Sequence, residues 1–253
     1  MTPDTAAAPA APDREVVPDF ESFGVTAFTT TRDWGSFGTH SEEPVRAVMG
    51  RWDALRAALQ HTMPASAARF ATAQQVHGTR VVEHEGAWEG WLRVNEADGH
   101  FAPRRGTAMA VTIADCVPMF LAHPEGAVAL LHSGWRGTAA RIVERALAAF
   151  SRQGFAAADL RLHLGPAICG ACYEVSADVA TALTGVPASG PQRIDLRALI
   201  AEHAEKGGVR MITTSAWCTR CDNARFFSHR AGDAGRQVSV IVARTETPRV
   251  DSP

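Results

Sequence analysis

The sequence lacks the features that mark membrane, exported and nucleic-acid-binding proteins. None of its apolar runs approaches the roughly 20 residues that span a bilayer. The first residues are rich in alanine and proline and carry acids (Asp4, Asp13), so they have neither the basic start nor the apolar centre of a signal peptide. The formal net charge of −2 gives no electrostatic reason to expect nucleic acid or an anionic membrane as a partner. We therefore expect a cytoplasmic protein that binds neither.

Cysteine is scarce as well. An odd number of cysteines in a chain without an export signal argues against a disulfide framework and for a reducing compartment. The five cysteines are Cys116, Cys169, Cys172, Cys218 and Cys221.

Length and composition predict one folded domain between two short tails. A chain of 253 residues can bury a full core. Residues 1–18 are too rich in alanine, proline and acids to offset the entropy of the chain by burial, so we expect a disordered tail there, and a flexible tail at 247–253. Residues 19–246 contain no internal repeat and no clear linker, which indicates a single domain.

Strands and helices are mixed along this domain. Several expected strands follow one another without an intervening helix, which favours an α/β (α+β) domain with mixed sheets over a doubly wound parallel sheet. The expected strands are 25–30, 70–76, 80–83, 107–113, 117–122, 127–131, 160–164, 209–213 and 237–242, and the expected helices are 44–59, 138–150, 175–183 and 195–206.

Three segments that end apolar runs each offer one ligand for a soft divalent metal. They are Gln75-Val76-His77-Gly78, Ala114-Asp115-Cys116-Val117-Pro118 and His132-Ser133-Gly134-Trp135-Arg136-Gly137. Two imidazoles and one thiolate leave the fourth position of a zinc ion free, which distinguishes catalytic zinc from structural zinc. No local zinc-finger spacing is present, so only the fold can bring His77, Cys116 and His132 together.

Each segment also has a purely structural interpretation. The segment after His132 joins a strand to a helix, where Arg136 either binds a phosphate or carboxylate or lies on the surface of a tight turn. Asp115 either orients a ligand imidazole or caps a turn. A histidine or cysteine taken singly is more often a core residue than a metal ligand.

A second metal site is conceivable, because the chain contains two CxxC pairs. Cys169-Gly170-Ala171-Cys172 and Cys218-Thr219-Arg220-Cys221 together supply the four thiolates of a structural zinc ribbon. The gap between the pairs (218 − 172 = 46) exceeds the usual ribbon spacing of roughly 15 to 20 residues. That mismatch favours binding loops over a ribbon. Tyr173-Glu174, which directly follows the first pair, either contacts a base or sugar or simply begins a helix.

Together these segments resemble the laccase-domain purine nucleoside phosphorylase family, also called the polyphenol oxidase or peptidoglycan-editing factor family. The resemblance covers about residues 25 to 244 and includes several long and unusual motifs. The matching stretches are Thr30-Thr31-Arg32, Gln75 to Gly78, Thr112 to Pro118, His132 to Thr138, Gly165 to Ile168, Tyr173 to Val175, Asp195-Leu196, Cys218-Thr219, Phe226 to Arg230 and Gly235-Arg236.

The resemblance implies a layered α/β/β/α domain and a specific activity. It implies one Zn²⁺ per chain, with copper possible, and the phosphorolysis of adenosine, inosine or methylthioadenosine to the base and ribose 1-phosphate, with adenosine deamination alongside. His77, Cys116 and His132 are the implied metal ligands. The candidate catalytic residues are Cys116, Asp115, Arg136 and Glu174, and the candidate substrate-binding residues are Arg32, Gln75, Tyr173 and Arg236.

Other functions use the same residues. Cys116 with His77 or His132 as base would suit a hydrolase or amidase that edits peptidoglycan precursors. A copper-dependent polyphenol oxidase is less favoured, because coupled oxidation needs several coppers and many histidines. A non-enzymatic nucleoside-binding protein remains the fourth hypothesis. The sequence departs from the family at residues 33–40, at Asp98-Gly99-His100-Phe101 and at His229, which affects substrate preference rather than the metal ligands.

Overall fold

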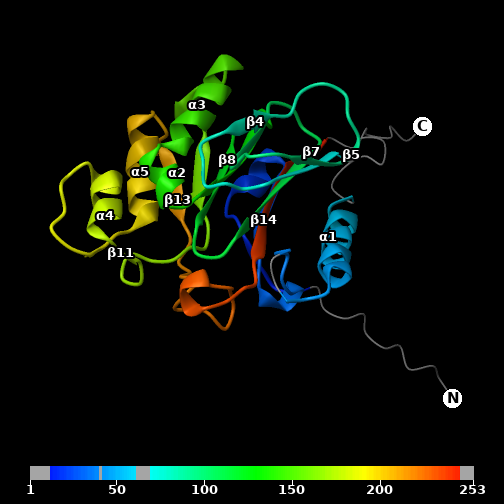
Figure 1. Ribbon diagram of the computed structural model, residues 1–253. Helices are drawn as coiled ribbons and strands as arrows, with labels where there is room; N and C mark the ends of the chain where they lie inside the picture. The colour runs from blue at the N-terminus through cyan, green and yellow to red at the C-terminus, as the bar shows by residue number, and fades with distance from the viewer. Residues whose placement is uncertain (1–11, 40–41, 61–68, 246–253) are drawn as a thin grey trace, which may run out of the picture.

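Two six-stranded mixed sheets lie face to face and carry helices on their outer faces (Figure 1). The computed structural model describes residues 12–39, 42–60 and 69–245. The first sheet has the order β1 (Arg14–Val16), β2 (Val25–Thr30), β14 (Gln237–Ala243), β7 (Thr107–Ile113), β3 (Arg69–Ala73) and β5 (Gly90–Val94). The second has the order β13 (Met211–Thr214), β10 (Arg161–Leu164), β8 (Val117–Ala122), β9 (Val128–Ser133), β6 (Gly99–Ala102) and β4 (Val81–Glu83), and a small separate hairpin pairs β11 (Glu174–Val175) with β12 (Gln192–Arg193).

The helices divide unequally between the two outer faces. In Figure 1 one helix stands on the right beside the first sheet and the others gather on the left beside the second. This arrangement confirms the single mixed α/β domain with α/β/β/α layers that the sequence and its family resemblance predicted. The first sheet is covered by α1 (Val45–Gln60), and the second by α2 (Trp135–Ala139), α3 (Ile142–Arg152), α4 (Ala177–Thr184) and α5 (Leu196–Lys206).

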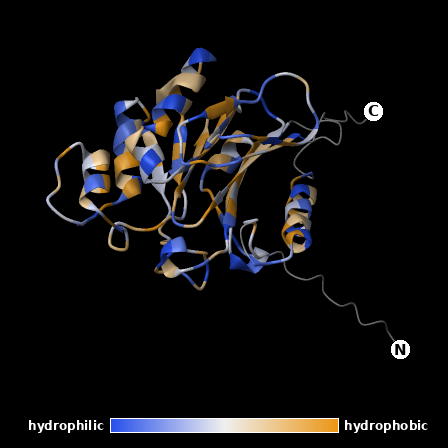
Figure 2. Cartoon of the chain, viewed as in Figure 1, coloured by the Kyte–Doolittle hydropathy of each residue, from blue (hydrophilic) through white to orange (hydrophobic). Residues whose placement is uncertain are grey.

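The central strands are buried on both faces, which explains their continuous apolar sequences. In β8, Met119 and Leu121 pack toward the helices, whereas Phe120 packs between the sheets. In β7, Met109 lies between the sheets and Ala108 faces the α1 side. In Figure 2 the sheets are coloured largely as apolar, whereas the helices carry both apolar and polar residues.

Part of the segment that was predicted to be disordered is ordered. Residues 14–16, which fall inside the predicted disordered segment, form the edge strand β1, and Val17 is buried between the sheets. The exposed edge of β2 supplies backbone partners for this polar segment, and composition does not reveal such partners. Residues 1–11 and the predicted flexible segment 247–253 lie outside the described residues.

Other element predictions change near the functional segments, and the strand expected over 70–76 ends as β3 at Ala73. The helix expected over residues 138–150 begins earlier and is divided into α2 and α3, because Arg141 between them has a left-handed backbone (φ 57°). The strand expected over residues 127–131 extends as β9 to Ser133, so His132 lies within it. The strands β5 and β6 were not expected. No helix within the described ranges is long and apolar enough to cross a bilayer.

The predicted cap of α5 is confirmed and can be tested. One carboxylate oxygen of Asp195 accepts hydrogen bonds from the backbone N–H groups of Arg197 (2.9 Å) and Ala198 (3.3 Å). We expect Asp195→Ala to lower the free energy of unfolding by about 1 kcal/mol, because two amide donors lose their partner. Denaturant unfolding measures this, with Asp195→Asn, which retains an acceptor oxygen, as the control. Equal destabilisation by both substitutions would contradict the capping role.

Candidate metal centre

The three expected metal ligands meet where the chain crosses between the two sheets. His77 lies in the connection from β3 of the first sheet to β4 of the second. Cys116 lies in the connection from β7 of the first sheet to β8 of the second, and His132 is near the end of β9. The antiparallel register of β8 and β9 pairs Pro118 with His132, which places Cys116 beside the end of β9. The fold therefore closes the long sequence gaps between the three ligands.

The three ligand atoms lie within 4.8 Å of one another. The rings of His77 and His132 are 4.8 Å apart between centroids and inclined at 72°. His77 is exposed, Cys116 is half-buried and His132 is buried. This donor set matches that of a zinc site with an open position on its exposed side.

Asp98 holds this set together, although the sequence analysis gave it no role. Its fully buried carboxylate accepts hydrogen bonds from the backbone N–H groups of Val76 (3.1 Å), His77 (2.9 Å) and Gly78 (2.7 Å). It also lies 2.8 Å from Nδ1 of His132, whose backbone N–H donates to the Asp98 carbonyl (2.7 Å). A carboxylate on Nδ1 leaves Nε2 free for a metal. The sequence offered one sign of this role, because Asp98 is an acidic residue directly before the strand β6.

The charges in this cluster support one another. Burial alone would raise the pKa of Asp98, but the hydrogen bonds from His132 and from backbone N–H groups lower it. Burial also opposes ionisation of Cys116 and His132. Their mutual attraction nevertheless lowers the pKa of Cys116 to about 6 and, with help from Asp98, raises that of His132 to about 9. The thiol therefore ionises easily, and the thiolate is the form that binds metals.

The backbone at the centre is strained in two places. His77 and Asp115 are non-glycine residues with positive φ angles of 60° and 84°. Such conformations cost of order 1 kcal/mol each and occur most often at functional sites, where the surrounding contacts enforce them. Three N–H bonds to Asp98 enforce the first. The second is enforced by Asp115 itself, whose carboxylate accepts from the Thr219 hydroxyl (2.6 Å) and from the Arg230 backbone N–H (2.7 Å).

A cavity of about 1040 Å³ opens over the metal centre. Its size suits a ligand larger than a single ring. Apolar and aromatic side chains from the α1 side and from the α4 side form opposite walls, including Met49, Trp52, Trp91, Val179 and Leu196. Four arginines also line it: Arg93, Arg136, Arg230 and Arg236.

Most of the expected substrate residues reach this cavity. Tyr173 and Glu174 line it from the segment that leads into α4, and the Arg230 guanidinium lies 4.9 Å from the centre of the Tyr173 ring. Arg136 is exposed and lies over the ring of its neighbour Trp135 (4.6 Å). Arg236 lines the cavity but donates three hydrogen bonds to carbonyls of residues 233–235, so its guanidinium is held in place.

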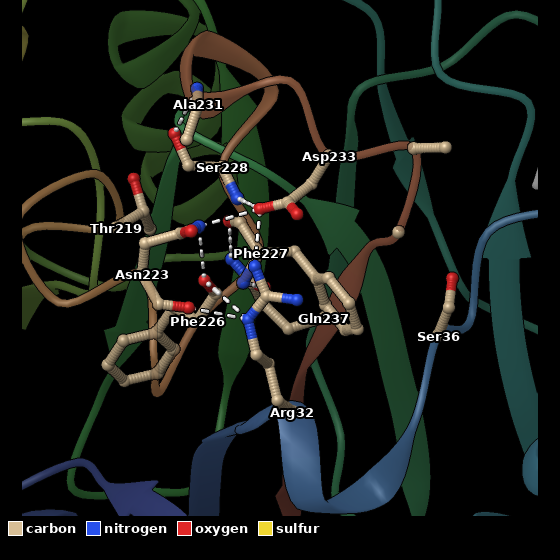
Figure 3. Close-up of polar contacts among 12 residues, drawn as sticks. Arg32, Ser36, Thr219, Asn223, Phe226, Phe227, Ser228, Ala231, Asp233 and Gln237 are labelled. Atoms are coloured by element: carbon tan, nitrogen blue, oxygen red, sulfur yellow. Dashed lines mark hydrogen bonds and ion pairs between the residues drawn. The ribbon is translucent and has the colours of Figure 1, made fainter.

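The structure does not place Arg32 in the cavity, contrary to the sequence analysis. Its guanidinium donates to the carbonyls of Asn223 (2.6 Å) and Phe226 (3.1 Å) and to the carboxylate of Asp233 (2.5 Å), as Figure 3 shows. It also lies over the ring of Phe227 (4.3 Å). Nε and Nη2 of Arg32 are therefore bound to the loop that carries Arg230, and these contacts hold that loop in place.

The polar side-chain atoms of two further candidate site residues are already bound to other residues of the protein. The amide of Gln75 lines the cavity but is bound to Thr112, accepting from its N–H (2.8 Å) and donating to its carbonyl (2.8 Å). The Asp115 carboxylate has a partner on each oxygen, as described above. Both residues therefore position the strands and loops around the cavity.

Comparison with known proteins shows the family of this chain. The family model for the multi-copper polyphenol oxidoreductase laccase domain matches residues 30–244. The chain belongs to this family. It is 33% identical over 198 residues to a purine nucleoside phosphorylase of Deinococcus radiodurans, covering 74% of this chain and 75% of that protein. It is 35% identical over 162 residues to the adenosine deaminase RL5 of an unknown prokaryotic organism, covering 58% and 60%.

A solved structure shows the same fold. The YfiH protein of Bacillus licheniformis superposes with a TM-score of 0.79 at 25% identity, covering 93% of this chain and 98% of that one. The family resemblance predicted from the motifs is therefore confirmed, and so is the fold that it implied.

Gly134 allows a direct test of the centre. A Cβ atom at this position would lie 2.9 Å from Sγ of Cys116 and 3.0 Å from Cδ2 of His77, although the backbone there is ordinary and extended. We expect Gly134→Ala to weaken metal binding at least about tenfold, since it displaces two ligands. The metal retained against a competing chelator measures this.

Gly50→Ala is the matched control, because a Cβ atom at Gly50 in α1 meets nothing within 4 Å. This control should keep the metal and gain up to about 1 kcal/mol of stability, because alanine favours a helix over glycine. Equal metal affinity in the two variants would exclude the arrangement described here.

Proposed function

We propose that this protein is a zinc-dependent purine nucleoside phosphorylase with adenosine deaminase activity that acts in the cytoplasm. The observation that carries the proposal is the His77, Cys116 and His132 set, held by Asp98 beneath a cavity lined by four arginines. The similarity to a purine nucleoside phosphorylase and to an adenosine deaminase supports the reaction class. The five free cysteines support a reducing compartment.

The residues present suit zinc. Nitrogen and sulfur ligands in a three-residue set are typical of catalytic zinc, and the space beside Gly134 is too narrow for a further side chain. Zinc with an open position polarises an atom of the water or substrate bound to it. Copper accepts the same donors, but multi-copper oxidation needs more histidine ligands than this group supplies. The described residues contain one other metal-ligand group, and it consists of cysteines alone.

Arg136 is the best candidate for binding phosphate. Its side chain is exposed at the cavity and, among the described residues, it forms no ion pair with a carboxylate. A guanidinium binds phosphate through two parallel hydrogen bonds. Arg230 and Arg236 are engaged by carbonyls and add positive charge at fixed positions. The purine and sugar then have the aromatic and apolar walls, including Tyr173, to pack against.

Phosphorolysis needs a nucleophile in place and a proton for the leaving base. A phosphate oxygen forms a bond to the anomeric carbon, the bond from that carbon to the purine nitrogen breaks, and the purine leaves with the electron pair and takes up a proton. Positioned arginines favour the attack by holding phosphate and offsetting charge repulsion. Glu174 is the preferred proton-transfer residue in either reaction, because Glu174 lines the cavity and is exposed, whereas the carboxylate of Asp115 is bound at both oxygens.

A cysteine hydrolase is the second candidate, and one observation favours it. His132 lowers the pKa of Cys116 to about 6 against the effect of burial, which produces a reactive thiolate at neutral pH. Metal dependence separates the two candidates. A chelator would abolish zinc-dependent turnover, whereas it would leave intact or increase the reactivity of a metal-free thiolate.

Loss of the ligands tests the proposed function. We expect His77→Ala, Cys116→Ala and His132→Ala each to lose about one zinc ion per chain. We also expect each to lose about 100-fold or more in turnover of adenosine with phosphate, because the metal supplies several kcal/mol of transition-state stabilisation. Metal analysis and release of adenine or inosine measure both quantities. Chelated wild-type protein should regain activity on zinc addition. Undiminished zinc in any variant, or turnover insensitive to chelation, would refute the assignment.

Arg136→Ala tests phosphate binding separately from the metal. We expect the KM for phosphate to rise about tenfold to a hundredfold, since a charge-assisted hydrogen bond contributes about 1.5–3 kcal/mol. Zinc content should stay unchanged. Arg145→Ala, on an exposed position of α3 outside the cavity, is the matched control. A KM for phosphate that is equal in both variants would exclude Arg136 as the phosphate ligand.

A further inference from the structure

Four cysteines that the proposed function does not use converge at one place. Cys169 and Cys172 form one CxxC pair, and Cys218 and Cys221 form the other. Their Sγ atoms all lie within 4.8 Å of one another, and those of Cys172 and Cys221 are 3.4 Å apart. All four are free cysteines. The sequence spacing argued against a continuous zinc ribbon, but the fold brings the four thiols of the two loops together.

The fold brings the two pairs together through the backbone. Ala167 and Cys218 form a parallel β-bridge, and the N–H of Thr219 donates to the Ala167 carbonyl (3.2 Å). The guanidinium of Arg220 in the second pair donates to the carbonyl of Cys172 in the first (3.2 Å). The two loops are therefore fixed side by side by contacts that do not involve the thiols.

Backbone N–H groups also donate hydrogen bonds to one of the thiols, which favours its metal-binding thiolate form. The N–H groups of Cys169 (3.3 Å) and Cys221 (3.4 Å) both donate to Sγ of Cys218, and donors of this kind stabilise a thiolate ligand. The first pair turns tightly, with the N–H of Cys172 donating to the Cys169 carbonyl (3.0 Å), and at the second pair the N–H of Asp222 donates to the Cys218 carbonyl (2.8 Å). A Cβ atom at Gly170 would lie 3.0 Å from the Cβ of Asp195, so the first turn packs closely against the start of α5.

The dimensions suit a tetrahedral metal and not a disulfide. Four sulfurs at about 2.3 Å from a zinc ion lie about 3.8 Å from one another, within the range seen here. A disulfide would need about 2.05 Å between two sulfurs and would leave the other two thiols unpaired. Four thiolates complete the coordination of zinc and leave no open position, which is the hallmark of a structural site.

We propose that Cys169, Cys172, Cys218 and Cys221 bind a second, structural zinc ion that joins the two loops forming one wall of the cavity. Tyr173 and Glu174, which line the cavity, directly follow Cys172. Thr219, which follows Cys218, donates its hydroxyl to Asp115 beside the other metal centre. The second ion thus connects the segments that shape the substrate site without taking part in the chemistry.

Metal content of three proteins tests the proposal. We expect the wild type to bind about two zinc ions per chain, and both the Cys172→Ser, Cys221→Ser double variant and His77→Ala to bind about one. Ala171→Ser is the matched control, since it adds a hydroxyl to the same exposed turn without removing a thiol. Equal zinc content in the double variant and this control would overturn the proposal.

The wild type alone provides a second test if the double variant does not fold. The protein would be purified without thiols or added metal and treated with iodoacetamide before and after chelation, and each cysteine would be mapped by mass spectrometry. Cys221 is exposed, so its protection before chelation requires a bound partner. We expect the four cysteines to be protected together and to become modified together once zinc is removed. Immediate modification of Cys221, or a mass that shows a disulfide among the four, would overturn the proposal.

The outcome is separate from that of the proposed function. If His77, Cys116 and His132 held no zinc, the wild type would contain about one ion, lost in the double cysteine variant and kept in His77→Ala. If the four cysteines held no zinc, the wild type would again contain about one ion, which the double cysteine variant would keep and His77→Ala would lose. Neither result depends on which substrate the protein turns over.

Discussion

The candidate metal centre depends on one buried carboxylate, that of Asp98. A charge in the interior is costly unless hydrogen bonds replace the lost water. Here three successive backbone N–H groups and the ring of His132 replace it. The same contacts fix the left-handed backbone of His77 and select the ring nitrogen with which His132 faces the cavity. The carboxylate therefore sets the positions of two ligands at once, and the third ligand follows from the pairing of β8 and β9.

The sandwich of two sheets places functional residues where the chain passes between layers. His77 and Cys116 lie in two such passages, and Asp115 turns the second one with a strained backbone. Irregular segments of this kind carry chemistry because the rigid sheets beside them hold their ends. The four cysteines also lie in irregular segments that regular backbone pairing holds in place. A parallel bridge between Ala167 and Cys218 aligns their two loops at the cavity wall.

The arginines show why residue type alone did not assign roles. Arg32, Arg136 and Arg236 all occur in motifs and are chemically equivalent in the sequence. In the fold, Arg32 is surrounded by carbonyls and the Asp233 carboxylate, and Arg236 is bound by neighbouring carbonyls. Arg136 lines the cavity and is exposed, and among the described residues it forms no ion pair with a carboxylate. A guanidinium binds whichever acceptors surround it, and only the packing determines whether those belong to the protein or to a substrate.

The sequence by itself indicated several of the strands and the candidate ligand set. Apolar periodicity located β2, β7 and β8 at their observed bounds, since burial on both faces requires continuous apolar runs. Donor chemistry at strand ends identified His77, Cys116 and His132 as one ligand set. The tertiary structure alone decided the role of Asp98, the structural use of Arg32 and the meeting of the two CxxC pairs. These depend on contacts between residues distant in the chain, and local propensity carries no information about such contacts.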